Sequence, residues 1–296
     1  MWKGLILLLS CSSITSFIEG QRLAVQKCEE YRKITSSPVQ NCTKVERPVD
    51  EDNVVRNGEI PHHALLGYLK EDKEDEYEFK CGGTLISDQH VLTAAHCIQR
   101  TIPEVVRLGI HDSENESNDE VQVAIESVLM HPEYSARKAY HDIAILKLVQ
   151  KVPLSRVIRP ACLWDTEYRS FSLYISTGFE TDYLSRKVGS VLMKLQLEEL
   201  SVEECTIVDL SSRYFPDGLH DGQLCVRTYS CDEFSGEALM PENATKPCIS
   251  YVVGIASRGT SCYNVVTSIY TKVSYYIDWI ESNVWGQNAT QTVQND

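Results

Sequence analysis

The chain has 296 residues, 43% of them hydrophobic, and a formal net charge of −14 at pH 7. This length and composition suit one large domain or two small ones with an ordinary core. An acidic chain is repelled by nucleic acid and by anionic membrane surfaces, so the charge argues against both as partners. We expect the acidic surplus to serve solubility in extracellular fluid.

The N-terminus has the features of a secretory signal. Lys3 supplies the positive region, Leu5 to Leu9 form an apolar stretch, and small or polar residues follow it. This stretch is too short to span a bilayer, and no later segment approaches the ~18 apolar residues of a membrane helix. We therefore predict that residues 1–20 are a signal peptide, that the mature chain begins at Gln21, and that the protein is secreted.

The cysteines agree with export. Cys11 leaves with the signal, and the ten that remain of eleven favour disulfides over free thiols or a metal. We predict no metal site and no cofactor. The acidic stretches Glu71–Glu78 and Asp112–Glu120 are expected to be solvated loops, although the second could instead supply oxygen ligands to calcium. The predicted glycan acceptors, each conditional on exposure, are Asn41, Asn115, Asn243 and Asn288.

The pattern of apolar and polar residues changes near Val55. Residues 21–54 are polar, have no clear period and carry two cysteines, which predicts a disulfide-tethered extension resembling a pro-segment. From residue 55, short apolar runs alternate with polar turns, as in an all-β sandwich or barrel. An amphipathic helix is predicted where Val273, Ile277, Ile280 and Val284 recur at helical spacing, and residues 286–296 form a polar tail. The predicted strands are Ala64–Leu69, Gly83–Ile86, Val105–Leu108, Val121–Met130, Ile143–Leu148, Leu192–Leu197, Tyr251–Ile255 and Ser268–Val273.

Three motifs carry a family resemblance. They are Cys81-Gly-Gly-Thr through Thr-Ala-Ala-His96-Cys97, then His141-Asp142-Ile-Ala-Ile-Leu, then Cys231-Asp-Glu-Phe-Ser235-Gly. Together they resemble the chymotrypsin/trypsin-like serine proteases, and the resemblance spans about residues 55–285. It implies an all-β fold of two antiparallel Greek-key β-barrels with a C-terminal α-helix.

The same resemblance assigns a catalytic triad. Ser235 would be the nucleophile, His96 the general base and Asp142 the group that orients the imidazole. A serine hydroxyl is a weak nucleophile, so it needs an imidazole to take its proton and a buried carboxylate to fix the tautomer. The order His, Asp, Ser along the chain matches this family. We expect His141 to be only a loop residue.

The loop around the serine departs from the family pattern Gly-Asp-Ser-Gly-Gly-Pro. The oxyanion-hole positions are Glu233 and Ser235, and a side chain at 233 would obstruct the turn of its amide while its carboxylate repels the oxyanion. Phe234 replaces the aspartate that pairs with the new N-terminus after activation, and Glu237 replaces the second glycine. Losing one oxyanion donor costs about 10²–10³ in rate.

The specificity pocket and activation site depart as well. Tyr229 stands where trypsin-like members carry aspartate, and Ser268 stands where the opposite wall has glycine. The substrate strand reads Ser257-Arg258-Gly259 in place of Ser-Trp-Gly, so the expected pocket positions include Ser257 and Gly259. Asn53-Val54 stands directly before Val55, so no basic residue occupies the scissile position and trypsin-like activation is not expected there.

Disulfides also follow from the resemblance. It implies Cys81–Cys97, Cys205–Cys225 and Cys231–Cys262, and it gives Cys162 either Cys28 or Cys42 as partner. Cys248 could take the other of these two, and the sequence does not fix the pairing. The opening Lys27-Cys28-Glu-Glu-Tyr31 looks like arthropod clip-type proteases and their non-catalytic homologues, although the extension lacks the six cysteines of a full clip module.

Three functions compete on this sequence. The first is a secreted protease homologue, non-catalytic or weakly active, that regulates an extracellular immune or melanisation-type cascade through proteases, zymogens or protease inhibitors. The second is an active serine endopeptidase of unusual specificity, which the intact triad favours. The third is a carrier or structural glycoprotein.

Overall fold

The computed structural model describes residues 21–34, 53–112, 119–167, 173–182, 187–207, 214–228, 235–242, 250–259 and 266–286. Several predicted features lie outside these residues: the signal peptide, the tail from residue 287, Cys42, Asn41, most of the proposed calcium-binding stretch with Asn115, Tyr229, Cys231, Glu233, Phe234, Asn243, Cys248, Cys262 and Asn288.

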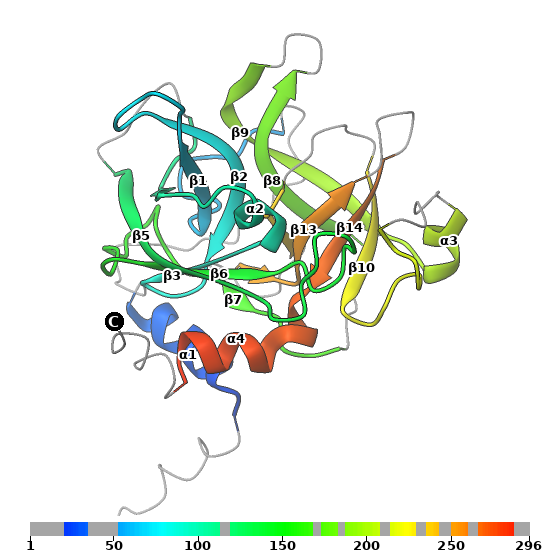
Figure 1. Ribbon diagram of the computed structural model, residues 1–296. Helices are drawn as coiled ribbons and strands as arrows, with labels where there is room; N and C mark the ends of the chain where they lie inside the picture. Colours follow the sequence, from blue (N-terminus) through cyan, green and yellow to red (C-terminus); the bar gives the residue numbers. More distant parts are fainter. Residues whose placement is uncertain are drawn as a thin grey trace, which may run out of the picture.

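Two closed antiparallel barrels form the body of the protein (Figure 1). The first has the strand order β1-β2-β3-β6-β5-β4 and the second the order β10-β14-β13-β11-β8-β9. The predicted two-barrel fold is therefore confirmed. The strands of the first barrel are β1 His63–Leu69, β2 Tyr77–Leu85, β3 His90–Thr93, β4 Val105–Leu108, β5 Val121–Met130 and β6 Ala144–Leu148. Those of the second are β8 Leu173–Asp182, β9 Lys187–Glu199, β10 Gln223–Thr228, β11 Ala238–Pro241, β13 Gly254–Gly259 and β14 Val266–Lys272.

Each barrel is filled by aliphatic and aromatic side chains. Leu66, Leu92 and Leu146 are fully buried in the first barrel, and Tyr174 and Val226 are fully buried in the second. Burying each such side chain contributes about 1.5–3 kcal/mol, so the barrels supply the rigid frame on which loops present the site.

Short helices connect and cover the barrels. They are α2 Ala95–Gln99, α3 Val202–Ile207, the 3₁₀ helix η1 Val273–Tyr276 and α4 Ile277–Val284. The predicted C-terminal helix is α4, preceded by the 3₁₀ turn, and it buries Ile277, Ile280 and Val284. A short parallel sheet pairs β7 (Cys162–Leu163) with β12 (Tyr251–Val252). Within the residues that the structure describes, no helix is long and apolar enough to cross a membrane.

The N-terminal extension contains a helix that the sequence did not predict. Helix α1 spans Leu23–Ile34 and lies beside α4 (Figure 1). Tertiary contacts hold it: the Arg22 guanidinium lies 2.5 Å from Asp278, the Ala24 amide donates to Glu281 at 2.8 Å, and a disulfide joins Cys28 to Cys162. Because most helical stability in proteins comes from packing, a polar sequence without clear period can still be helical here.

The Cys28–Cys162 bond should keep α1 attached after the chain is cut. We predict that a protein with a site-specific protease sequence inserted between residues 36 and 40, before Cys42, stays one species on a non-reducing denaturing gel after cleavage. Reduction should then release the N-terminal fragment. The Cys28→Ser variant is the control and should release the fragment without reductant. Release from the parent protein on the non-reducing gel would show that the tether is absent.

Candidate functional site

His96 and Asp142 meet at the edge of the first barrel. His96 lies in α2, directly after β3, and Asp142 lies just before β6. The His96 Nδ1–H donates to Asp142 Oδ2 at 2.8 Å, and the His96 backbone amide donates to Oδ1 at 2.8 Å. A proton held on Nδ1 leaves the lone pair on Nε2, which is the tautomer a general base requires.

The second barrel completes the surroundings of Asp142. The carboxylate is buried, with the residue 3% exposed, and it accepts a 2.6 Å hydrogen bond from Ser257 Oγ. Thr271 Oγ1 of β14 donates to the Asp142 carbonyl oxygen at 2.9 Å. A buried carboxylate is costly without such donors, so these bonds both stabilise Asp142 and join the two barrels.

Ser235 reaches the same junction from the second barrel. Its carbonyl oxygen accepts a hydrogen bond from the Gly82 amide at 2.9 Å. Gly236 has φ +80°, and a side chain there would meet the Gly82 carbonyl and the Thr93 hydroxyl, so the turn after the serine requires glycine.

The half of the triad formed by Ser235 is not closed by a hydrogen bond. Among the contacts of the described residues, none joins the Ser235 hydroxyl to His96, whose Nε2 lies 3.7 Å from Cys97 Sγ. Catalytic hydrogen bonds are often long without substrate, so this geometry leaves the reactivity of Ser235 open to experiment.

Glu237, two residues after Ser235, is buried beneath the serine turn. It is 3% exposed, and its carboxylate lies 3.1 Å from Nδ1 of the equally buried His63. A side chain at Gly82 would collide with this carboxylate. Burial raises the pKa of Glu237, and the neighbouring His63 opposes that shift. The sequence showed the substitution at 237 but gave no sign of its partner, because the two residues are 174 positions apart.

The positions expected to line the specificity pocket are distributed over two strands. Gly259 of β13 and Ser268 of β14 are direct partners in the sheet. Ser257 instead directs its hydroxyl to Asp142, and Arg258 stacks its guanidinium 3.8 Å above the Tyr214 ring. The strand therefore carries a cation beside the site where the family has tryptophan.

The segment expected to be the activation site is already part of the sheet. The Val55 amide donates to the Leu192 carbonyl at 2.8 Å, and the Lys194 amide donates to the Asn53 carbonyl at 2.6 Å. Val55 is 2% exposed. In the uncut chain, residues 53–55 thus occupy a fixed place against β9.

Disulfides support the site, and they also exclude one metal cluster. The structure joins Cys81 to Cys97 and Cys205 to Cys225. Ligand atoms of Cys81, Cys97 and His96 lie within 4.8 Å of one another, but both sulfurs are in the disulfide and cannot act as thiolates.

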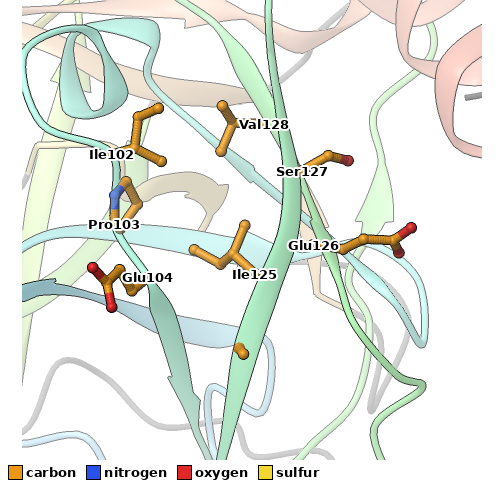
Figure 2. Close-up of a pocket in the computed structure, with 8 residues that line it drawn as sticks. Ile102, Pro103, Glu104, Ile125, Glu126, Ser127 and Val128 are labelled. Atoms are coloured by element: carbon orange, nitrogen blue, oxygen red, sulfur yellow. The ribbon is translucent and has the colours of Figure 1, made fainter. Parts of the chain in front are cut away.

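A hollow of about 440 Å³ lies on the first barrel, between residues 102–104 and strand β5 (Figure 2). Its walls combine apolar side chains with carboxylates, and none of the triad residues lines it. We therefore place the chemistry at the junction of the barrels. The lining residues are Ile102, Pro103, Glu104, Ala124, Ile125, Glu126, Ser127 and Val128.

Comparison with known families shows the family to which this chain belongs. The Trypsin family matches residues 53–280. The chain belongs to the trypsin family. A similar solved structure is titled "Structure of GrC"; it shares 24% sequence identity with this chain at a TM-score of 0.65, and the match covers 78% of this chain and 97% of that one. That likeness supports the fold alone.

Several trypsin-family relatives are arthropod proteins. Serine protease snk of Drosophila melanogaster is 30% identical, and the match covers 95% of this chain and 69% of that protein. Serine protease Hayan of the same species is 30% identical over 91% of this chain but only 43% of its own length. Inactive CLIP domain-containing serine protease A8 of Anopheles gambiae is 30% identical over 77% of this chain and 66% of its own.

The His63–Glu237 pair should be strongly coupled. We predict that Glu237→Ala and His63→Ala each lower the free energy of unfolding by about 1–3 kcal/mol, because each leaves a buried polar partner unpaired. The double variant should cost clearly less than the sum, as measured by urea denaturation. The control is the exposed pair Lys138–Asp217, 3.2 Å apart, where the coupling should not exceed about 1 kcal/mol. Additive costs at 63 and 237 would contradict the pairing.

The raised pKa of Glu237 gives a pH test. The folded state holds the proton of this carboxyl more tightly than the unfolded state does, so its contribution to stability is present at low pH and is lost as the pH rises through the folded pKa. We predict that the parent protein loses stability relative to Glu237→Gln as the pH rises from the ordinary glutamate range towards neutrality. Parallel urea midpoints at all pH values would contradict the shift.

Proposed function

We propose that this chain is a secreted trypsin-like serine protease homologue with little or no peptidase activity, which regulates an extracellular proteolytic cascade. It would do so by binding a protease, a zymogen or a protease inhibitor. The proposed organisation is a signal peptide at 1–20, a disulfide-tethered extension at 21–54, the protease domain at 55–285 and a polar tail at 286–296.

The observation that carries this proposal is the loop around the serine. Glu237 fills the space beneath Ser235 as a buried partner of His63. Upstream, Glu233 and Phe234 replace the residues whose backbone and carboxylate build the oxyanion hole. Electrostatic stabilisation of the oxyanion is usually the largest single contribution to catalysis, so a serine without it reacts slowly.

The activation segment supports the same proposal. The residue directly before Val55 is Val54 and not a basic residue, and Phe234 offers no carboxylate to a new N-terminus. In the uncut chain Val55 is nevertheless buried, and residues 53 and 55 are hydrogen-bonded to β9. Because the uncut chain already holds this segment in place, cleavage is not needed to dock it.

The relatives indicate the kind of partner. Their names include Phenoloxidase-activating enzyme 1 of Spodoptera litura, 29% identical over 78% of this chain and 65% of its own length, as well as the inactive Anopheles protein. Similar sequences thus carry names of both active and inactive proteins. A protease-shaped surface without turnover suits a protein that binds other members of a cascade.

A second candidate is an active serine endopeptidase of unusual specificity. The His96–Asp142–Ser257 hydrogen bonds favour it, since they hold the imidazole in the tautomer that catalysis needs. On this alternative, Ser235 would attack a peptide carbonyl and His96 would carry the proton to the leaving amine.

A fluorophosphonate probe separates the two candidates, because it labels only a serine activated by its surroundings. We predict that the full-length secreted protein is labelled far below one probe per chain, with or without prior trypsin treatment. Stoichiometric labelling that disappears in Ser235→Ala would establish the active enzyme and refute our proposal.

A repaired variant shows whether the loop is the cause. Glu233→Gly with Phe234→Asp restores the family residues, and Val54→Arg adds a cleavage site so that Asp at 234 gains a terminal amine as partner. After trypsin treatment this variant should be labelled more strongly than the parent by about 10²-fold or more.

A separate experiment tests the regulatory role. The parent protein and Ser235→Ala, each added to the source fluid, should change the rate of zymogen activation equally.

A further inference from the structure

We propose that His131, Glu133 and His141 form a zinc-binding site at the base of the loop between β5 and β6. One ligand atom from each side chain lies within 4.8 Å of the other two. Two imidazoles and one carboxylate form a donor set that zinc binds, and such three-ligand sites leave the fourth position to water. The proposal does not depend on whether Ser235 is reactive.

Strand pairing brings the two histidines together. His131 follows β5 and His141 precedes β6, and Met130 pairs with Ala144 at the ends of these antiparallel strands. The His131 amide donates to the Ile143 carbonyl at 3.0 Å, which extends the pairing past the strands. As a result the two rings stack with centroids 5.1 Å apart and planes 11° apart.

The surroundings of His141 orient its ring for a metal. Nδ1 lies 3.0 Å from the Tyr276 hydroxyl, and when the Nδ1–H donates to that oxygen the lone pair of Nε2 is left for a metal. The backbone at His141 is in the left-handed region, with φ +56°, and the Ile143 amide donates to its carbonyl at 2.8 Å. The rings of Tyr276 and Trp279, each 5.1 Å from His131, hold the other imidazole.

Zinc binding would require the stacked imidazole planes, 11° apart, to turn so that one lone pair of each ring points at the same ion. Metal–ligand bonds of 2.0–2.2 Å require ligand atoms about 3.4 Å apart in a tetrahedron. Glu133 is exposed and can rotate towards the histidines. His131 Nδ1 accepts a long hydrogen bond of 3.3 Å from the Glu133 amide. If His131 bound zinc through Nε2, its proton would move to Nδ1, and this hydrogen bond would be lost.

A bound zinc ion would join the two ends of the loop that leads into Asp142. The loop also reaches the second barrel, where Lys138 pairs with Asp217 at 3.2 Å and the Tyr140 hydroxyl donates to the Gly218 carbonyl at 2.7 Å. We therefore expect zinc to slow amide hydrogen exchange in residues 131–143, a readout that does not involve peptidase activity.

Calorimetric titration of the metal-free, full-length secreted protein with ZnCl₂ tests the site. We expect one ion per chain. His131→Gln and His141→Asn should each weaken binding at least about 100-fold, and Glu133→Gln about tenfold. Asparagine is used at 141 because it tolerates the left-handed backbone. Co²⁺ in place of zinc should give visible absorption bands that both histidine variants lack.

Two controls keep the test decisive. His90→Gln alters a histidine of β3 and should bind zinc as the parent does, and unfolding in EDTA shows whether each variant folds. If His131→Gln is unstable, the comparison rests on His141→Asn, in which zinc should no longer raise the unfolding temperature. No zinc binding by the parent, binding kept in both histidine variants, or binding lost only in His220→Gln, whose ring lies 5.2 Å from His141, would overturn the site.

Discussion

The buried carboxylate of Asp142 is the constraint on which the junction of the two barrels depends. It accepts hydrogen bonds from the His96 amide and imidazole in the first barrel and from Ser257 in the second. A carboxylate in this position needs all of these donors, because an unpaired buried charge is far costlier than any one bond gained. Asp142 and its donors thus stabilise the assembled fold, and they do not by themselves decide whether Ser235 is reactive.

Ser235 and Glu237 differ in what they contribute to the packing of the barrel junction. No contact of the Ser235 hydroxyl is needed to assemble the barrels, since the turn is held by its carbonyl and by Gly236. Glu237 does take part in the packing, because its burial is tolerable only beside His63. The glutamate that replaces the family's glycine at 237 is therefore paired with His63 across the barrel junction. A glycine restored at 237 alone would leave His63 buried without its carboxylate partner.

Alternating apolar runs and helical spacing are local signals, and they predicted a β-rich sandwich or barrel and the C-terminal helix. The two-barrel arrangement came from the family resemblance of the motifs around His96, Asp142 and Ser235. Strands such as β3 and β10 lacked such clear signals and were missed. Helix α1 was missed because its stability comes from Cys28–Cys162 and from contacts with α4. The approach of His131 to His141 could not be predicted without the strand register, although two histidines flanking a short loop between strands were visible and His141 was expected to be only a loop residue.

Regulation by cleavage requires two states, with the activation segment free in one and docked in the other. In this chain the docked arrangement exists before any cut, with Val55 buried and Asn53 paired to Lys194. A ligand or a modification shifts an equilibrium only by the difference between its interaction free energies with the two states. Cleavage therefore contributes little free energy to docking a segment that is already docked. On our two proposals, we expect switching to come from binding, either of a protein partner or of an ion at the loop that carries Asp142.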